Sequence, residues 1–112
     1  MEYKLYFENQ QIGIIEQKDE DFPNLFGKYK ILHSIEKEQE LISKYIQYSV
    51  KASIFMKEDE KKWQDLMEEE ESKFIELFDS ENWTLIDQNG KTHKILIPNF
   101  CDKNEIVWRW NF

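Results

Sequence analysis

The hydrophobic and polar positions alternate with a period of two at the start of the chain. Apolar residues occupy every second position of 3–7, and a second apolar run, 12–15, follows the polar residues 8–11. This pattern is typical of strands with one buried face and predicts an N-terminal β-hairpin. The next stretch, 17–28, combines a charged run with aromatic residues around Pro23. Because proline disfavours helix at the residue before it, we expect an ordered loop whose aromatic side chains pack onto the domain.

The central part of the chain has the period of an α-helix. Apolar residues recur three, four and seven positions apart, which predicts helices near 35–54 and 58–79. Ser34 and Asp59 are residue types that cap helix N-termini, and both stand close to the predicted starts. The expected buried face of the first helix comprises Leu41, Tyr45, Tyr48 and Ala52, with Ile42 and Ile46 beside them. That of the second helix comprises Trp63, Leu66, Met67, Phe74, Leu77 and Phe78.

The period returns to two in the C-terminal third. Strands are predicted near 83–87, 92–97 and 105–111, and the Asn89-Gly90 dipeptide between the first two favours a tight hairpin turn. The predicted fold class is α+β, with one domain, 1–112, and the order β-β-α-α-β-β-β. We expect an antiparallel sheet of about five strands with two helices on one face. A chain of this length can bury a core without disulfides or metal ions.

The last predicted strand carries the most distinctive residues. Trp108 and Trp110 flank Arg109, so the two indoles are expected on one face and the guanidinium on the other. Arg109 is the single arginine beside 14 lysines, and arginine binds carboxylates with two parallel hydrogen bonds. We expect Arg109 either to form an ion pair with an acid or to bind an anionic ligand. The candidate acids are those of the loop, Asp19, Glu20 and Asp21, and also Asp87.

Composition and charge narrow the classes of function. The net charge is −8, and no local basic stripe offsets it, so binding to nucleic acid is disfavoured. No apolar run approaches the roughly 18 residues of a membrane span, and the N-terminus lacks the pattern of a signal peptide. With Cys101 as the one cysteine, no intrachain disulfide can form, and we expect a cytoplasmic protein.

The acidity is concentrated in the second predicted helix. Residues 57–79 contain ten acids and four lysines and so carry −6 of the total −8. Such a face steers association with a basic protein. The alternative is that the acidity serves only to keep the protein soluble. Glu70 and Glu71 fall at the edge of the apolar stripe, where desolvation would raise a carboxylate's pKa, but a charge run more often marks a solvated face. The candidate partner-binding residues are Glu68, Glu69, Glu71 and Glu76.

The sequence contains no recognisable catalytic, metal or cofactor motif. Cys101 and the two histidines lie in no nucleophile motif, and Cys101 is interpreted as a small buried side chain. The patterns CxxC and HExxH do not occur, and the consecutive acids Asp19, Glu20 and Asp21 point in different directions. We therefore expect no metal and no cofactor, and the sequence favours a non-enzymatic role.

Several short motifs resemble those of small uncharacterised bacterial α+β proteins. The motifs are Asp21-Phe22-Pro23 followed by Gly27, then Trp83, Gly90, Ile97-Pro98 and Trp108-Arg109. Some proteins of this size and acidity are immunity proteins of toxin systems. The resemblance thus implies a protein-binding role and carries no catalytic residues.

Two hypotheses of different classes follow from the sequence. The first is an acidic protein-binding module, such as an immunity or inhibitor protein, that meets a basic partner through the second helix. The alternative is a small-ligand-binding or enzymatic domain with a pocket near Arg109 and the Asp19–Phe26 loop.

Overall fold

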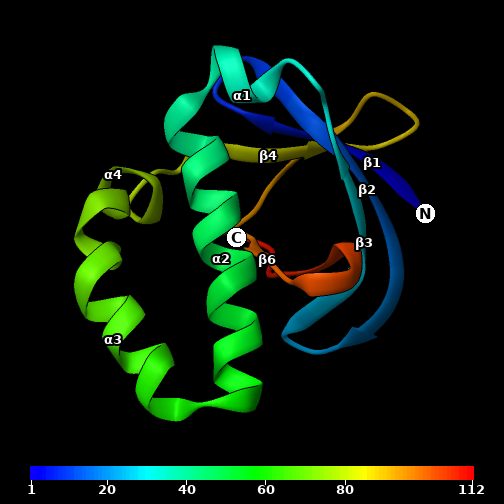
Figure 1. The fold of residues 1–112 in the computed structure, drawn as a ribbon. Helices are drawn as coiled ribbons and strands as arrows, with labels where there is room; N and C mark the ends of the chain where they lie inside the picture. The colour runs from blue at the N-terminus through cyan, green and yellow to red at the C-terminus, as the bar shows by residue number, and fades with distance from the viewer.

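A computed structural model describes residues 1–112, in which a curved antiparallel sheet carries its helices on one side (Figure 1). The seven strands lie in the order β5-β4-β1-β2-β3-β7-β6. Their bounds are β1 Glu2–Phe7, β2 Gln10–Asp21, β3 Asn24–Ile31, β4 Trp83–Ile86, β5 Thr92–Lys94, β6 Asn99–Phe100 and β7 Glu105–Trp108. The α+β class and the antiparallel sheet are confirmed. The expected number of about five strands and the expected element order are wrong, because three strands, not two, precede the helices and four, not three, follow them.

The extra strand before the helices, β3, begins in the segment predicted to be a loop. β2 continues to Asp21, the chain turns at Phe22-Pro23, and β3 returns antiparallel with Asp21 opposite Asn24. The outer half of β2 is exposed on both of its faces, so no apolar alternation marks it as a strand. The expectation that the aromatic residues pack onto the domain is also wrong for Phe22, which is 83% exposed.

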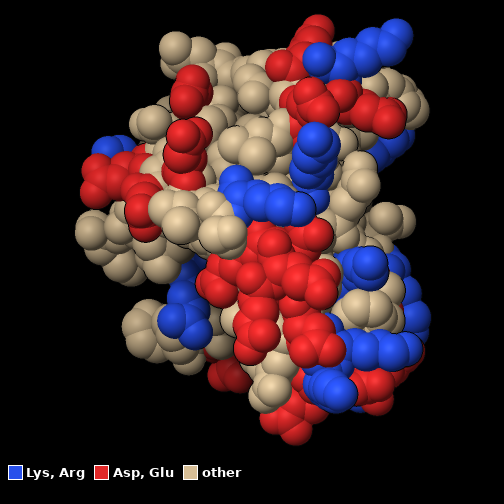
Figure 2. Space-filling view, turned by 60° about the vertical axis from the view of Figure 1, so that its left-hand side comes forward, with Lys and Arg blue, Asp and Glu red and all other residues tan.

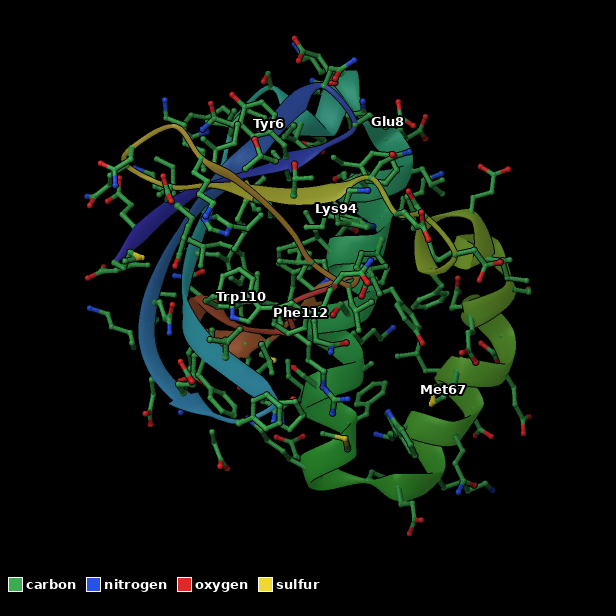
Figure 3. The ribbon with its side chains drawn as sticks, turned by 180° about the vertical axis from the view of Figure 1, so that it is seen from behind. Tyr6, Glu8, Met67, Lys94, Trp110 and Phe112 are labelled. Carbon is green, nitrogen blue, oxygen red and sulfur yellow. The ribbon has the colours of Figure 1, made fainter.

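The two ends of the sheet are joined. Ile95, just after β5, forms a β-bridge with Trp110, just after β7. The N–H of Leu96 donates to the carbonyl of Arg109, and the N–H of Asn111 donates to the carbonyl of Lys94. Figure 3 shows Lys94 and Trp110 on the rear of the molecule, where these ends meet. The sheet therefore bends into a partly closed barrel.

Two glycines permit this bend by allowing backbones to approach closely. A Cβ at Gly13 would lie 2.3 Å from the carbonyl oxygen of Lys30, and one at Gly27 would lie 2.2 Å from that of Glu16. The pairing of β1 with β2 and that of β2 with β3 each contain a register shift, and such bulges increase strand bending. The long β2 strand thus curves around the core instead of continuing flat.

Both predicted helices are broken into shorter helical segments. The helical segments of the chain are α1 Ile35–Glu38, α2 Glu40–Glu58, α3 Glu60–Glu70, the 3-10 turn η1 Glu71–Phe74, α4 Ile75–Phe78 and a second 3-10 turn, η2 Asp102–Asn104. The break at Gln39 coincides with a tertiary contact, because its side-chain amide donates to Gln10 Oε1 at 2.6 Å. The Asp59 cap is confirmed, since its carboxylate accepts from the N–H groups of Lys61 and Lys62. Ser34 makes no side-chain capping bond.

The core lies between the concave face of the sheet and the helices. Trp83 and Trp108 are its largest fully buried side chains, and Tyr45 contributes from the centre of α2. Ile42, expected beside the buried face of α2, is buried, but that face differs from the prediction in that Leu41 is 36% exposed and Ser49 is buried. Trp108 and Trp110 lie together, with ring centroids 6.3 Å apart, and Arg109 points outward as predicted.

Candidate functional site

Helix α2 is fastened to the sheet through β6. The Ser49 hydroxyl donates to the carbonyl oxygen of Phe100 at 2.9 Å and accepts from the N–H of the same residue at 2.8 Å. The Tyr45 hydroxyl donates to the carbonyl of Pro98 at 2.7 Å, and Ser53 Oγ accepts from the N–H of Asp102 at 3.3 Å. These bonds fix the position of α2 along its whole middle section.

Helix α3 lies outside α2, on the side away from the β2–β3 hairpin (Figure 1). Leu66 and Phe74 are buried and hold this side of the molecule together. The α2 residues that face α3 and β6 include the small Ser49, Ala52 and Ser53. Because small side chains on one wall face large ones on the other, the two helices enclose a groove.

This groove has a volume of about 430 Å³ and is mainly apolar. Trp63 and Met67 line it from α3, and Figure 3 shows Met67 on the side of α3 that faces α2. The remaining lining residues come from α2, from β6 and its neighbours, and from the turn after α3: Tyr45, Tyr48, Ser49, Ala52, Ser53, Met56, Glu71, Phe78, Asn99, Phe100, Cys101 and Val107. A concave apolar site of this size, with a few polar groups, is typical of ligand and anchor pockets.

Three titratable groups that line the groove have perturbed acidities, and burial raises the pKa of the Tyr45 hydroxyl well above its ordinary value. Burial raises the pKa of the Tyr48 hydroxyl, and the carboxylates of Glu71 and Glu70 raise it further. Burial also raises the pKa of the Cys101 thiol, which opposes formation of the reactive thiolate. The geometry therefore offers Tyr48 as a hydrogen-bond donor, and it supports a structural role for Cys101.

The outer face of α3 is acidic. Figure 2, in which the α3 side comes forward, shows acidic side chains gathered into one large patch over this helix, with lysines at its borders. Asp65, Glu68 and Glu69 are exposed there, and no cationic nitrogen lies within 4.0 Å of their carboxylates. Of the other predicted partner-binding residues, Glu71 is exposed at the groove and Glu76 is exposed on α4.

Glu70 occupies a different environment from its neighbours. Its side chain is 32% exposed and forms an ion pair with Lys73 at 2.7 Å. It lines a second hollow, of about 520 Å³, with Lys44, Lys51 and Lys73. Glu71, in contrast, is exposed. Glu70 can therefore lie at the edge of the apolar stripe because its charge is paired with that of Lys73.

Arg109 does not form the expected ion pair with Asp19 or Asp21. Its Nε donates to Asn24 Oδ1 at 2.9 Å, and no carboxylate oxygen lies within 4.0 Å of the guanidinium. The cause is the strand order, since β3 lies between β2 and β7 and the pairing of Leu25 with Trp108 places Asn24 beside Arg109. None of the five main cavities is lined by Arg109, Asp19 or Asp21.

A pairing that sequence reasoning missed closes the β4–β5 turn. Asp87 Oδ2 lies 2.9 Å from His93 Nε2, and Asp87 Oδ1 accepts from the N–H groups of Asn89 and Lys91. The bond to His93 and the backbone bonds hold the pKa of the Asp87 carboxyl below its ordinary value. An Asp just before Asn89-Gly90 is a turn signal that indicates such a cap. The arrangement stabilises the turn, and no main cavity adjoins it.

No group of three or more His, Cys, Asp and Glu side chains converges in a way that could hold a metal ion. None of the helices combines the length and the apolar character needed to cross a bilayer. The groove combines an apolar lining with a few polar groups and includes residues of α3, the helix that carries the acidic face. Comparison of the chain with protein-family models, curated proteins and solved structures finds no significant match in any of the three.

Proposed function

We propose that this protein is an acidic binding module that recognises a basic protein, in the manner of an inhibitor or immunity protein. The observation that carries the proposal is the exposed, uncompensated acidic face of α3, formed by Asp65, Glu68 and Glu69. Like charges three and four positions apart destabilise a helix, so this face carries an energetic cost in the free protein. A basic partner would remove that repulsion on binding.

The position of the face also supports recognition. α3 lies on the outside of the molecule, and its apolar side meets α2 (Figure 1). Its acids can therefore contact a partner without any rearrangement of the core. A concentrated field of one sign accelerates encounter with a molecule of opposite sign and contributes mainly to the association rate.

The experiment begins with capture of partners from the native host, followed by association kinetics on each captured protein. We expect association to slow markedly between roughly 50 and 500 mM salt, because salt shortens the range of the field, while dissociation changes little. Replacement of three acids together (Asp65→Asn, Glu68→Gln and Glu69→Gln) should reproduce that slowing at low salt.

A matched control removes the same number of charges elsewhere. Asp19→Asn, Glu20→Gln and Asp21→Asn change three exposed acids on the β2–β3 hairpin, which lies on the other side of α2 from α3. This control should leave the association rate close to that of the wild type. Equal slowing by both triple variants would show that net charge alone acts, and a captured partner that is acidic would contradict the proposal.

A further inference from the structure

The groove between α2 and α3 is large enough to accept more than one apolar side chain. A protein cavity of about 150 Å³ holds a benzene ring, and this groove measures about 430 Å³. Met56 at its margin is 61% exposed, and Trp63 and Met67 are only half-buried. Several large apolar side chains of the groove therefore remain partly in contact with water. Their full burial would be favourable when a partner side chain enters.

Polar groups at the groove suit a cation. Glu71 is exposed at the rim, and no cationic nitrogen of the protein lies within 4.0 Å of its carboxylate. Tyr48 and Asn99 also line the groove, and neither the Tyr48 hydroxyl nor the Asn99 side-chain amide forms a hydrogen bond within the protein. A lysine or arginine at the rim would find an ionised acceptor in Glu71 and a second oxygen in Asn99.

The negative charge of α3 beside the groove determines which class of molecule can fill the groove favourably. A second copy of this chain would bring another net charge of −8 against the acidic face of α3, and like charges across an interface oppose association. An acidic or neutral segment would leave the acids of α3 uncompensated. A basic segment satisfies both the apolar groove and the acidic border.

We propose that the groove binds a basic amphipathic segment of the partner, whose large apolar side chains enter between Ala52 and Met67 while a lysine or arginine pairs with Glu71. This inference rests on the proposed function and adds the chemical class of the partner's contact segment. Apolar anchors that enter a pocket commonly dominate the affinity of an interface, whereas border charges mainly affect its rate of formation. The groove should therefore control dissociation.

The test uses a display library of random peptides of about 16 residues, a length at which an isolated helix can begin to form. Selection against the whole protein should enrich peptides that carry lysine or arginine together with large apolar residues three or four positions apart. In amide NMR spectra, the enriched peptide should shift the signals of the groove residues Ala52, Met67 and Cys101.

Three variants and one control then locate the binding. Met67→Ala removes apolar contact, Ala52→Met fills the groove with a flexible side chain, and Glu71→Gln removes the rim charge. We expect each of the first two to accelerate peptide dissociation about tenfold, as for an anchor contact, and Glu71→Gln to weaken binding by a smaller factor. Leu96→Ala shortens a side chain that is 45% exposed outside the groove and should have no effect. Circular dichroism melts confirm that each variant remains folded.

The outcomes separate this inference from the function on which it rests. Basic peptides that shift only Asp65, Glu68 and Glu69 and ignore Met67→Ala would leave the acidic-face function intact and overturn the groove inference. Uncharged peptides that fill the groove without any dependence on salt would overturn the basic class of the contact segment and leave the acidic-face function to its own kinetic test. Failure to enrich any peptide with the expected pattern, while a basic protein binds through the acidic face, would overturn the groove inference alone.

Discussion

The hydroxyl of Ser49 bonds both the carbonyl and the N–H of Phe100, so one side chain of α2 completes the backbone bonding of one residue of β6. Ser49 is 6% exposed and Phe100 is fully buried, so water cannot replace these bonds. The contact joins the helical layer to the sheet and also positions one wall of the groove.

Ser49→Ala should destabilise the fold by about 1–3 kcal/mol, because it strands two buried backbone groups. The control is Ser43→Ala on the same helix, whose hydroxyl accepts only a long bond from the exposed Gln47 side chain. Both variants gain the same helix propensity, and the control should stay within about 0.5 kcal/mol of the wild type. Urea unfolding followed by circular dichroism gives both values, and equal effects of the two variants would contradict the prediction.

The two largest core side chains differ in one hydrogen bond. Trp83 donates its indole N–H to the carbonyl of Leu77 at 3.1 Å, whereas the buried indole N–H of Trp108 has no partner. Trp83→Phe should therefore cost about 1 kcal/mol more than Trp108→Phe, since it alone breaks a buried hydrogen bond. The loss of ring volume is the same in both variants. Urea unfolding curves of the two variants give the loss in free energy of unfolding, and a greater loss for Trp108→Phe would contradict the prediction.

The start of α3 depends on a cap that the start of α1 lacks. Asp59→Ala removes the acceptor for the N–H groups of Lys61 and Lys62 and should cost about 0.5–2 kcal/mol. Ser34→Ala removes no capping bond and should be close to neutral. Thermal melts of the two variants test the difference. If Ser34→Ala proved the more destabilising, the assignment of the caps would be incorrect.

The Asp87 pair should make stability depend on acidity. The pKa of this carboxyl is lowered in the folded state, chiefly by the bond to His93. The folded protein therefore binds this proton less readily than the unfolded chain. The resulting stabilisation is present above the unfolded pKa of about 3.9 and is lost as the pH falls through the lower folded value. Urea unfolding between about pH 6 and pH 2 should show this loss, and Asp87→Asn should make the acid limb shallower.

A second variant identifies the cause of that shift. His93→Phe keeps an aromatic ring near Tyr3 and Trp110 but removes the ring nitrogen that contacts Asp87. The pKa of Asp87, measured by NMR titration of its side chain, should rise towards the ordinary value. An unchanged pKa would assign the shift to the backbone bonds alone.

Periodicity revealed most of the secondary structure, and it failed where burial does not alternate. The N-terminal hairpin, strands β4 and β7 and the helical region were predictable, because one face of each is buried. The two-residue strand β6 was not predicted. The outer half of β2 has exposed residues on both faces, and the proline after Phe22 suggested a loop. The break at Gln39 depends on Gln10, which lies 29 positions away and is invisible to a local pattern.

The candidate site was predictable only in part. Charge counting identified the acidic face, because helical spacing alone places Glu68 and Glu69 away from Trp63. The groove depends on the distance between two helices and the sheet, which no single segment encodes. Its one local signal is the run of small residues Ser49, Ala52 and Ser53 on α2, opposite large ones on α3. The contact of Arg109 with Asn24 followed from a strand order that the sequence did not reveal.

The bridge between Ile95 and Trp110 has a consequence for how the protein behaves at high concentration. Exposed edge strands recruit strands from other chains and so begin aggregation. Here the chain just after the edge strand β5 is bridged to the chain just after β7, and α2 bonds the backbone groups of Phe100 in the other edge strand, β6. An incoming strand therefore meets no long row of unpaired backbone groups, and addition of a partner's strand to the sheet is disfavoured. Loss of this closure would turn the same curved sheet into a template for its own polymerisation.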